Sequence, residues 1–275
     1  MTLHFRGAAV GPLLALAGCA QTPVSLEPAA EAATDCFVLR AEWQPMTQSK
    51  YRLHETEPAL AALRAPAVAA EVRSWPNASL ASILPADGQP LGVPFRVAVA
   101  DFLPFLRQIH PGACERVQHM IQAPGAFGCV VERSDATLDV LYRVHAGFEI
   151  EANAAWMAPA QFEGRLVVDR RAGTVDHFSL RLPPTRPNVV VNVAQDFGVI
   201  ADIGSIPAMS DGTAAAPRAG DTDRLRHARA VLERAFYDFA AIDWLPLEEG
   251  LERANAEELP LHVVVLFGAL TDESC

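Results

Sequence analysis

Clusters of basic residues are missing from this sequence, whose formal net charge is -11 over 275 residues. A surface that binds nucleic acid needs neighbouring lysine and arginine side chains to neutralise the phosphates. The acidic balance and the lack of such a cluster therefore exclude nucleic acid as a partner. Hydrophobic residues make up 51% of the chain, which is enough for one large domain or two small domains with a packed core.

Long apolar runs are missing too, and no stretch reaches the roughly 20 residues with which a helix crosses a bilayer. The N-terminus instead has the layout of a signal peptide. Arg6 precedes a short apolar segment, Ala8 to Ala17, and Leu16-Ala17-Gly18-Cys19 matches the lipobox of bacterial lipoproteins. We predict that Cys19 is lipidated and that the chain is exported and lipid-anchored on the periplasmic side of a bacterial membrane. A misassigned start codon and a plain secretory signal are the alternatives.

Metal-ligand spacings are also absent. Besides Cys19, the sequence has four cysteines: Cys36, Cys114, Cys129 and Cys275. None of them forms the paired short interval of a zinc site. A disulfide among the first three and buried free thiols both remain open, because sequence cannot assign the pairing. His145 and His177 fall on predicted strands without further ligands nearby, so we predict hydrogen-bonded or solvent-facing histidines and no bound metal.

The middle of the chain is predicted to be rich in β-strands. From Leu138 to Ile150 apolar and polar side chains alternate, which predicts one long strand with a single buried face. Further strands are predicted at Phe37–Pro45, Arg165–Asp169, Val175–Leu182, Val189–Ala194 and Val199–Ile206. Gly173 can supply the positive φ that the turn after Asp169 needs.

Helices are predicted to be few in this region. Prolines limit Glu57–Glu71 to a short helix, and Pro76–Val93 reads as a loop. A short helix is predicted at Ala100–Ile109, with Asp101 as a candidate cap and a break at Pro104.

The last part of the chain is predicted to be helical and then β. Thr222 is expected to cap a helix that runs to about Ala240 with an apolar stripe. Pro246 opens a second helix, Leu247–Glu258, with Leu251 and Ala254 on its inner face. A buried apolar strand follows at Leu261–Phe267. The apolar stripe of the helix that begins at Thr222 consists of Leu225, Ala228, Leu232, Ala235, Phe236 and Phe239.

A short polar turn then leads from this strand to Cys275. A thiol placed after a strand, where a helix would begin, is the layout in which thioredoxin-like folds present a redox cysteine. The predicted fold class is α+β. The predicted segments are a signal peptide at 1–19, a tether at 20–35, a β-rich domain at 36–208, a linker at 209–221 and a partial thioredoxin-like unit at 222–275.

At its end the chain resembles a known family. The segment that leads into the Ser-Cys-Sec-Gly redox motif of the selenoprotein N family is similar to Phe267-Gly268-Ala269-Leu270-Thr271-Asp272-Glu273-Ser274-Cys275. Two further stretches resemble that family, Tyr142-Arg143-Val144-His145-Ala146-Gly147-Phe148-Glu149 and Ala158-Pro159-Ala160-Gln161-Phe162-Glu163-Gly164. The resemblance covers roughly residues 36–275, and long colinear matches are more specific than a short motif.

The resemblance implies that a selenocysteine follows Cys275 and that the chain is truncated at its redox motif because a UGA codon was read as a stop. It implies catalytic roles for Cys275 and Ser274, with a protein disulfide or a peroxide as substrate and no other cofactor. Vertebrate members carry a calcium-binding EF-hand, whose ligand pattern occurs nowhere in this sequence, so calcium binding does not carry over.

Two functions therefore remain open. One is a lipid-anchored, exported thiol or selenol–disulfide oxidoreductase that is catalytically incomplete as written. The other is a non-catalytic periplasmic lipoprotein whose β-rich domain binds a partner protein. In that case the final cysteine is an ordinary free thiol or only switches the binding.

Overall fold

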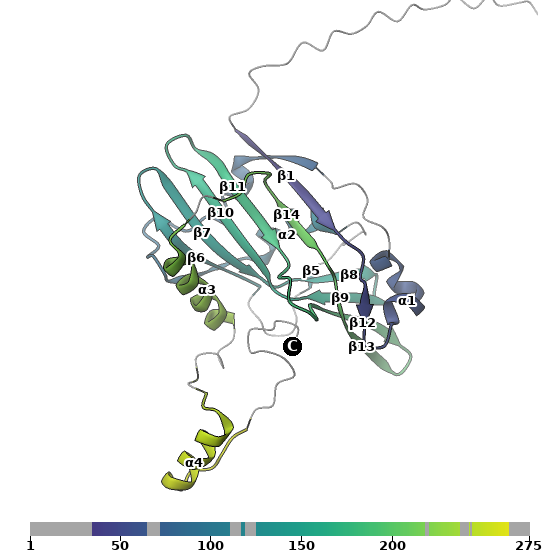
Figure 1. The fold of residues 1–275 in the computed structure, drawn as a ribbon. Helices are drawn as coiled ribbons and strands as arrows, with labels where there is room; N and C mark the ends of the chain where they lie inside the picture. The colour runs from purple at the N-terminus through teal and green to yellow at the C-terminus, as the bar shows by residue number, and fades with distance from the viewer. Residues whose placement is uncertain are drawn as a thin grey trace, which may run out of the picture. The chain divides into compact units, whose positions relative to one another are not determined.

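The computed structural model describes residues 35–64, 72–110, 125–217, 220–236, 242 and 244–263, together with the backbone pairing of Val117–Gln118. These residues form a β-rich fold with two antiparallel sheets and few helices (Figure 1). The described residues include no helix with the length and apolar character needed to span a bilayer.

Sheet A is the larger of the two sheets. Its strands are β1 (Cys36–Trp43), β3 (Val72–Pro76), β4 (Pro94–Val97), β6 (Ala126–Arg133), β7 (Thr137–Val144), β10 (Phe162–Asp169), β11 (Thr174–Arg181) and β14 (Met209–Gly212). Their order is β3-β1-β14-β11-β10-β7-β6-β4. Every pair of neighbours is antiparallel. The centre of the sheet therefore joins strands that lie far apart in the sequence.

Sheet B has six strands. They are β2 (Gln48–Ser49), β5 (Val117–Gln118), β8 (Gly147–Glu151), β9 (Ala155–Pro159), β12 (Val189–Gln195) and β13 (Gly198–Ser205). Their order is β2-β13-β12-β9-β8-β5. The valines at 189, 191 and 193 of β12 are buried while the residues between them are half-buried, as expected for a strand with one face in the core.

Helix α2 (Val99–Ile109) covers the inner face of sheet A. Phe102 packs edge-on against Tyr142 of β7, with ring centroids 5.3 Å apart. Phe105 lies 5.0 Å from Phe178 of β11. The short helices are α1 (Leu53–Thr56), η1 (Pro58–Arg64) and η2 (Asn77–Leu80), of which η1 contacts β8 of sheet B. The main core therefore combines apolar residues of both sheets with those of α2 and η1.

The predicted helix at Ala100–Ile109 exists, but two of its details are wrong. The helix continues through Pro104, whose ring is exposed, instead of breaking there. Its apolar side chains at 102, 105, 106 and 109 are almost fully buried, and this packing outweighs the one main-chain hydrogen bond that proline removes. Asp101 does not cap the helix: Ala98 precedes its first residue without a side-chain cap, and Asp101 lies in the first turn.

The predicted strands are largely confirmed, and the hairpin of β10 and β11 turns at Gly173 with a φ of +68°. The single strand predicted for Leu138–Ile150 is wrong in one respect. It divides into β7 in sheet A and β8 in sheet B, because the chain leaves sheet A at His145 and Ala146. Alternation of side chains cannot reveal this change of sheet, because the alternation in the sequence continues from β7 into β8.

The linker predicted for residues 209–221 also differs from the structure. Met209–Gly212 forms β14, which pairs with both β1 and β11 inside sheet A. Helix α3 (Thr222–Phe236) follows and packs on the outer face of β6 and β7 (Figure 1). Its predicted apolar stripe is confirmed up to Phe236. The cap is Asp221, not Thr222, because its carboxylate accepts hydrogen bonds from the N–H groups of the next two helical residues after Thr222.

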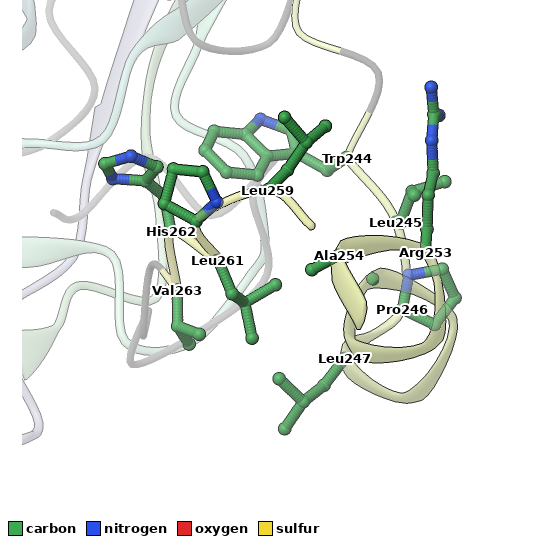
Figure 2. A pocket seen from close by; sticks show the side chains of 12 residues that line it. Trp244, Leu245, Pro246, Leu247, Arg253, Ala254, Leu259, Leu261, His262 and Val263 are labelled. Carbon is green, nitrogen blue, oxygen red and sulfur yellow. The ribbon is translucent and has the colours of Figure 1, made fainter. Parts of the chain in front are cut away.

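Helix α4 (Leu247–Glu257) follows Pro246, as predicted. No residue of α4 is buried, so the inner face predicted for Leu251 and Ala254 is not covered by the described residues. Leu259–Val263 runs beside the helix and, with Trp244, encloses a hollow of about 350 Å³ (Figure 2). Leu261–Val263 forms no strand, and the remainder of the strand predicted to Phe267 lies outside the described residues.

Candidate functional site

The residues predicted to carry chemistry are mostly outside the described part of the chain. Cys19, Ser274 and Cys275 lie there, and so does Cys114. The two cysteines that the structure describes, Cys36 and Cys129, are free thiols, the first exposed and the second buried.

Cys129 behaves as a small buried hydrophobe. Burial raises the pKa of its thiol, and a hydrogen bond from the Gly92 backbone N–H offsets this only in part. It belongs to a small apolar cluster between helix α3 and strands β6 and β7, with Leu141, Ala228 and Leu232 as other members. The thiol therefore lies beneath helix α3. A protonated, inaccessible thiol is a poor nucleophile.

The two internal stretches that resemble selenoprotein N meet in space. Residues 142–144 at the end of β7 pair with residues 162–164 at the start of β10, so that Arg143 lies opposite Glu163 and Tyr142 opposite Gly164. A Cβ atom at Gly164 would come within 3.0 Å of Tyr142 Cβ, which explains glycine at this position. Tyr142 points into the core and donates a hydrogen bond to the Ile83 carbonyl at 2.8 Å. Burial raises its pKa, so the phenol stays protonated.

On the opposite face of the same strands lies a polar group that we name the Arg143 cluster: Arg143, Gln161, Glu163, Arg181 and Arg229. Arg143 is buried and donates from Nε to the Gln161 side-chain oxygen. Its guanidinium carbon lies 6.0 Å from the centre of the Phe236 ring at the end of α3, which is cation–π distance.

Glu163 forms the exposed half of the cluster. Its carboxylate oxygens lie 3.7 Å from an Arg181 nitrogen and 3.6 Å from an Arg229 nitrogen. Such loose, solvent-accessible ion pairs are individually weak. The cluster therefore carries more positive than negative charge on an otherwise acidic chain. A fixed guanidinium beside further arginines can bind an anionic or hydrogen-bond-accepting group.

The Arg143 cluster was not predicted as a site from the sequence. Its signal was present in the alternation of β7 and β10, where Arg143 and Glu163 occupy the face opposite to the core residues. What sequence alone could not supply was the pairing of β7 with β10 and the position of helix α3 above them.

A second polar group follows along the same face of sheet A. Arg165 Nη2 lies 2.7 Å from Asp139 Oδ2, and both side chains are nearly buried. A second hydrogen bond joins Arg165 Nε and Asp139 Oδ1 at 3.1 Å. A Cβ atom at Gly220 would lie 2.9 Å from Arg165 Nη2, so the chain leading to α3 passes directly over this pair.

His177 is hydrogen-bonded, which was one of the two environments expected for it. Its Nδ1 lies 2.8 Å from the Ala215 carbonyl oxygen and its Nε2 lies 3.1 Å from Ser179 Oγ. Burial lowers the pKa of the imidazole. The ring therefore fastens the chain after β14 to strand β11. His145 lies in the connection between β7 and β8 and not on a strand, and its backbone N–H donates to the Gly125 carbonyl.

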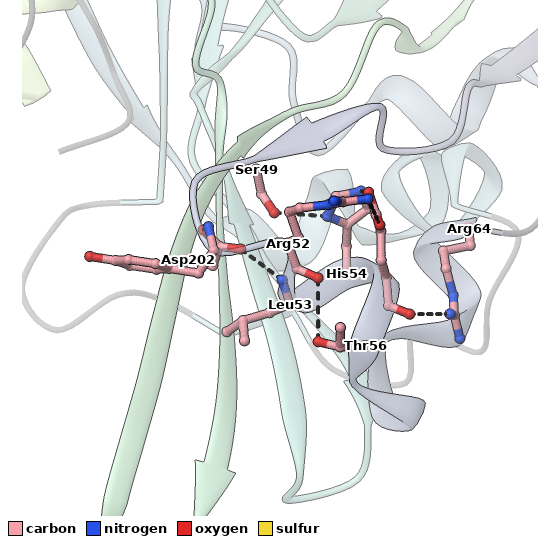
Figure 3. Close-up of polar contacts among 9 residues, drawn as sticks. Ser49, Arg52, Leu53, His54, Thr56, Arg64 and Asp202 are labelled. Atoms are coloured by element: carbon pink, nitrogen blue, oxygen red, sulfur yellow. Dashed lines mark hydrogen bonds and ion pairs between the residues drawn. The ribbon is translucent and has the colours of Figure 1, made fainter.

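A serine, a histidine and an aspartate also meet beside sheet B (Figure 3). Ser49 Oγ lies 2.8 Å from His54 Nδ1, and the Ser49 hydroxyl also hydrogen-bonds Asp202. The carboxylate of Asp202 accepts the backbone N–H groups of Tyr51 and Leu53. Burial alone would raise the pKa of Asp202, but these hydrogen bonds together lower it.

This group does not have the order of a hydrolase triad. In a triad the aspartate orients the histidine, whereas here the serine stands between the two and the carboxylate holds backbone N–H groups. The group anchors the start of α1 to strand β13. Among the described residues no group of three His, Cys, Asp or Glu side chains could hold a metal ion.

Comparison with known proteins supports the resemblance stated from the sequence. The chain is 28% identical over 208 residues to human selenoprotein N, a match that covers 62% of this chain and 35% of the human protein. It is 26% identical to mouse selenoprotein N over 62% of this chain and 37% of the mouse protein. Zebrafish selenoprotein N is 26% identical over 55% of this chain and 34% of its own length.

The chain spans about a third of the length of these curated relatives, 34% to 37%. No family model matches the sequence, and no solved structure is significantly similar. The resemblance rests on three vertebrate proteins that carry the same name. By sequence, the chain is therefore selenoprotein N-like.

Proposed function

We propose that this chain acts as a thiol or selenol–disulfide oxidoreductase of the selenoprotein N type, with Cys275 as its redox thiol. The observation that carries the proposal is the similarity to human, mouse and zebrafish selenoprotein N. The final residues support it by their sequence pattern, because a thiol after an apolar run and a short polar segment is the pattern with which a thioredoxin-like unit presents its redox group. The Arg143 cluster adds no redox group of its own.

The proposed chemistry needs a neighbouring group that the resemblance supplies, a selenocysteine after Cys275. A selenol is ionised at neutral pH, whereas the negative charges of Asp272 and Glu273 disfavour a thiolate at Cys275. A substrate disulfide would take up two electrons and two protons and leave as two thiols. The Cys275 thiol and the selenol of the following selenocysteine would lose these two electrons and two protons and form a sulfur–selenium bond. A peroxide would leave instead as water and an alcohol, and an external dithiol would restore the pair.

Adjacent residues can close only a small ring across one peptide bond. A bond in that ring departs from relaxed disulfide geometry and is therefore readily reduced again, which suits a catalytic couple. Ser274 would supply a hydroxyl hydrogen bond at the site or cap the helix that a thioredoxin-like unit begins there.

We further propose that the protein works at a membrane surface on the periplasmic side, attached through Cys19. The lipobox Leu16-Ala17-Gly18-Cys19 and the polar tether after it support this location. Replacing Cys19 with Ser should abolish labelling by a fatty-acid probe. Labelling that persists in the Cys19→Ser chain would contradict lipidation at this residue.

The redox proposal is tested by comparing the chain as given with a chain continued beyond Cys275, carrying cysteine or selenocysteine next and the natural downstream sequence. The continued chain should reduce a model disulfide much faster than the shorter one, and Cys275→Ser in the continued chain should remove the gain. Equal rates for the shorter chain, the continued chain and its Cys275→Ser variant would contradict the proposed oxidoreductase function. They would favour the alternative, a binding lipoprotein, for which the exposed apolar edge of sheet B is the supporting observation.

A further inference from the structure

Among the described strands, β2 alone borders the outer edge of strand β13, and it covers only one end of that edge. On that side β2 pairs only with Gly204 and Ser205, and Lys50 N–H donates to the Ile203 carbonyl. Main-chain groups on an antiparallel strand point alternately to its two sides. Because the Ile203 and Ser205 carbonyls face β2, the N–H and C=O groups of Val199 and Ala201 face the same side. No described strand lies beside them there.

The side chains around this edge are apolar and exposed. Phe197, in the turn between β12 and β13, is fully exposed at 104%, and Val199 is 54% exposed. Ile200 and Ile203 are each 44% exposed. Because they lie an odd number of residues apart on the strand, their side chains point to opposite faces of the sheet. Between Phe197 and Ile203 the one charged residue is Asp202, which is fully buried.

Natural proteins usually protect an open edge with exposed charges, proline or a bulge. None of these occurs between Gly198 and Ala201. An edge strand with free hydrogen-bonding groups and apolar side chains on both faces is a surface for pairing with another strand.

We propose that the partner is a second copy of this chain, paired antiparallel through β13 about a two-fold axis at Ile200. In this register Val199 of each copy lies opposite Ala201 of the other, so that the outward N–H and C=O groups of both residues gain partners. Ile200 of one copy then lies opposite Ile200 of the other. The contact is isologous, because each copy contributes the same residues.

The charges at the two ends of the β13 edge favour a second copy of the chain as the partner. Asp196 lies at the turn end, and Lys50, the only lysine of the sequence, lies at the β2 end. Antiparallel pairing of two copies brings each Asp196 towards the Lys50 of the other copy, with Phe197 beside Tyr51. A lipid surface would give Asp196 no such counter-charge. The edge is short, so we expect association in the micromolar range, weaker than that of large obligate interfaces.

The inference goes beyond the proposed redox function and does not depend on Cys275. It is tested by sedimentation velocity on the full chain with Cys19→Ser, so that an attached lipid cannot drive association. A dimer should form as the concentration rises. Val199→Lys should raise its dissociation constant more than about tenfold, because it places new positive charges at the centre of the contact. Val38→Lys is the matched control, since Val38 of β1 is also 54% exposed.

Two further measurements make the test specific. Phe197→Ser cannot disturb the core, since the ring is fully exposed, and it should also weaken the dimer. A zero-length carbodiimide reagent should join Lys50 of one copy to Asp196 of the other, and Lys50→Arg should remove this cross-link while the dimer persists. A chain that stays monomeric, or a dimer that Val199→Lys and Phe197→Ser leave intact, would overturn the proposal. So would a monomer that binds lipid vesicles through Phe197.

Discussion

At the residue scale, the Asp139–Arg165 pair is a nearly buried charged contact within sheet A. Two hydrogen bonds join the side chains, and little solvent reaches either of them. A buried ion pair adds little net stability over an apolar pair, but removing one partner leaves an uncompensated charge. The pair therefore also fixes the position of the segment around Gly220, which passes over it.

Asp139→Asn should lower the free energy of unfolding by about 3 kcal/mol, because the Arg165 charge stays buried without its counter-ion. The control is Asp223→Asn on α3. The Arg226–Asp223 pair has the same 2.7 Å separation, but both side chains are exposed. Denaturant unfolding should show almost no change for the control. Equal losses in the two variants would mean that burial does not set the strength of these pairs.

His177 gives a pH dependence whose sign follows from its surroundings. Burial lowers the pKa of the folded imidazole below the ordinary value of 6.5. Below pH 6.5 the unfolded chain binds a proton that the folded chain does not, so the free energy of unfolding falls as the pH drops through this range. Above this value both states are neutral and this contribution is constant.

His177→Gln should therefore flatten the pH dependence of stability between about pH 7 and pH 5, since glutamine cannot be protonated there. Thermal unfolding at a series of pH values measures the difference between the two chains, in which the contributions of the other histidines cancel. Parallel curves for the two chains would show that His177 has the same pKa folded and unfolded.

At the element scale, helix α3 belongs to the packing of sheet A. Ala228, Leu232 and Phe236 are buried against Phe127, Cys129 and Leu141 of β6 and β7. The sequence predicted the helix and its apolar stripe but placed it in a separate unit after a linker. The stripe shows that a helix has a buried face without showing which surface covers it.

Leu232→Ala should cost about 3 kcal/mol and should destabilise β6 and β7 together with α3. Leu251→Ala on α4 is the matched control, because Leu251 is exposed and should cost little. Denaturant unfolding gives the energies, and amide hydrogen exchange in β6 and β7 reports whether the sheet responds. Unchanged exchange in both strands would support an independent unit after the linker.

The β10–β11 hairpin could be predicted from the sequence, whereas β14 and the Arg143 cluster could not. The hairpin of β10 and β11 was predictable because alternation and Gly173 both act locally. β14 was not, because Met209-Ser210-Asp211-Gly212 has a linker's composition and owes its strand conformation to β1 and β11 on either side. The Arg143 cluster was hidden for the same reason: its members come from separate parts of the sequence and meet only through strand order.

At the scale of the whole molecule, the described residues form a β-rich fold with two antiparallel sheets, and the proposed redox chemistry belongs to the end of the chain. The similarity to selenoprotein N links the two, because the stretches that resemble it include both the β7–β10 pair and the segment that ends at Cys275. Besides that proposed chemistry, the β-rich fold has two candidate binding surfaces, the Arg143 cluster and the β13 edge.

The central claim is that Cys275 forms half of an exchangeable pair with the residue that follows it. The most direct measurement is the mass of the C-terminal peptide from the continued chain after reaction with a substrate disulfide and rapid alkylation. The account predicts a peptide in which Cys275 and its neighbour are joined, lighter by two hydrogens and unalkylated, which an external dithiol converts back. A peptide in which both residues are alkylated, despite a fold that remains intact, would contradict it.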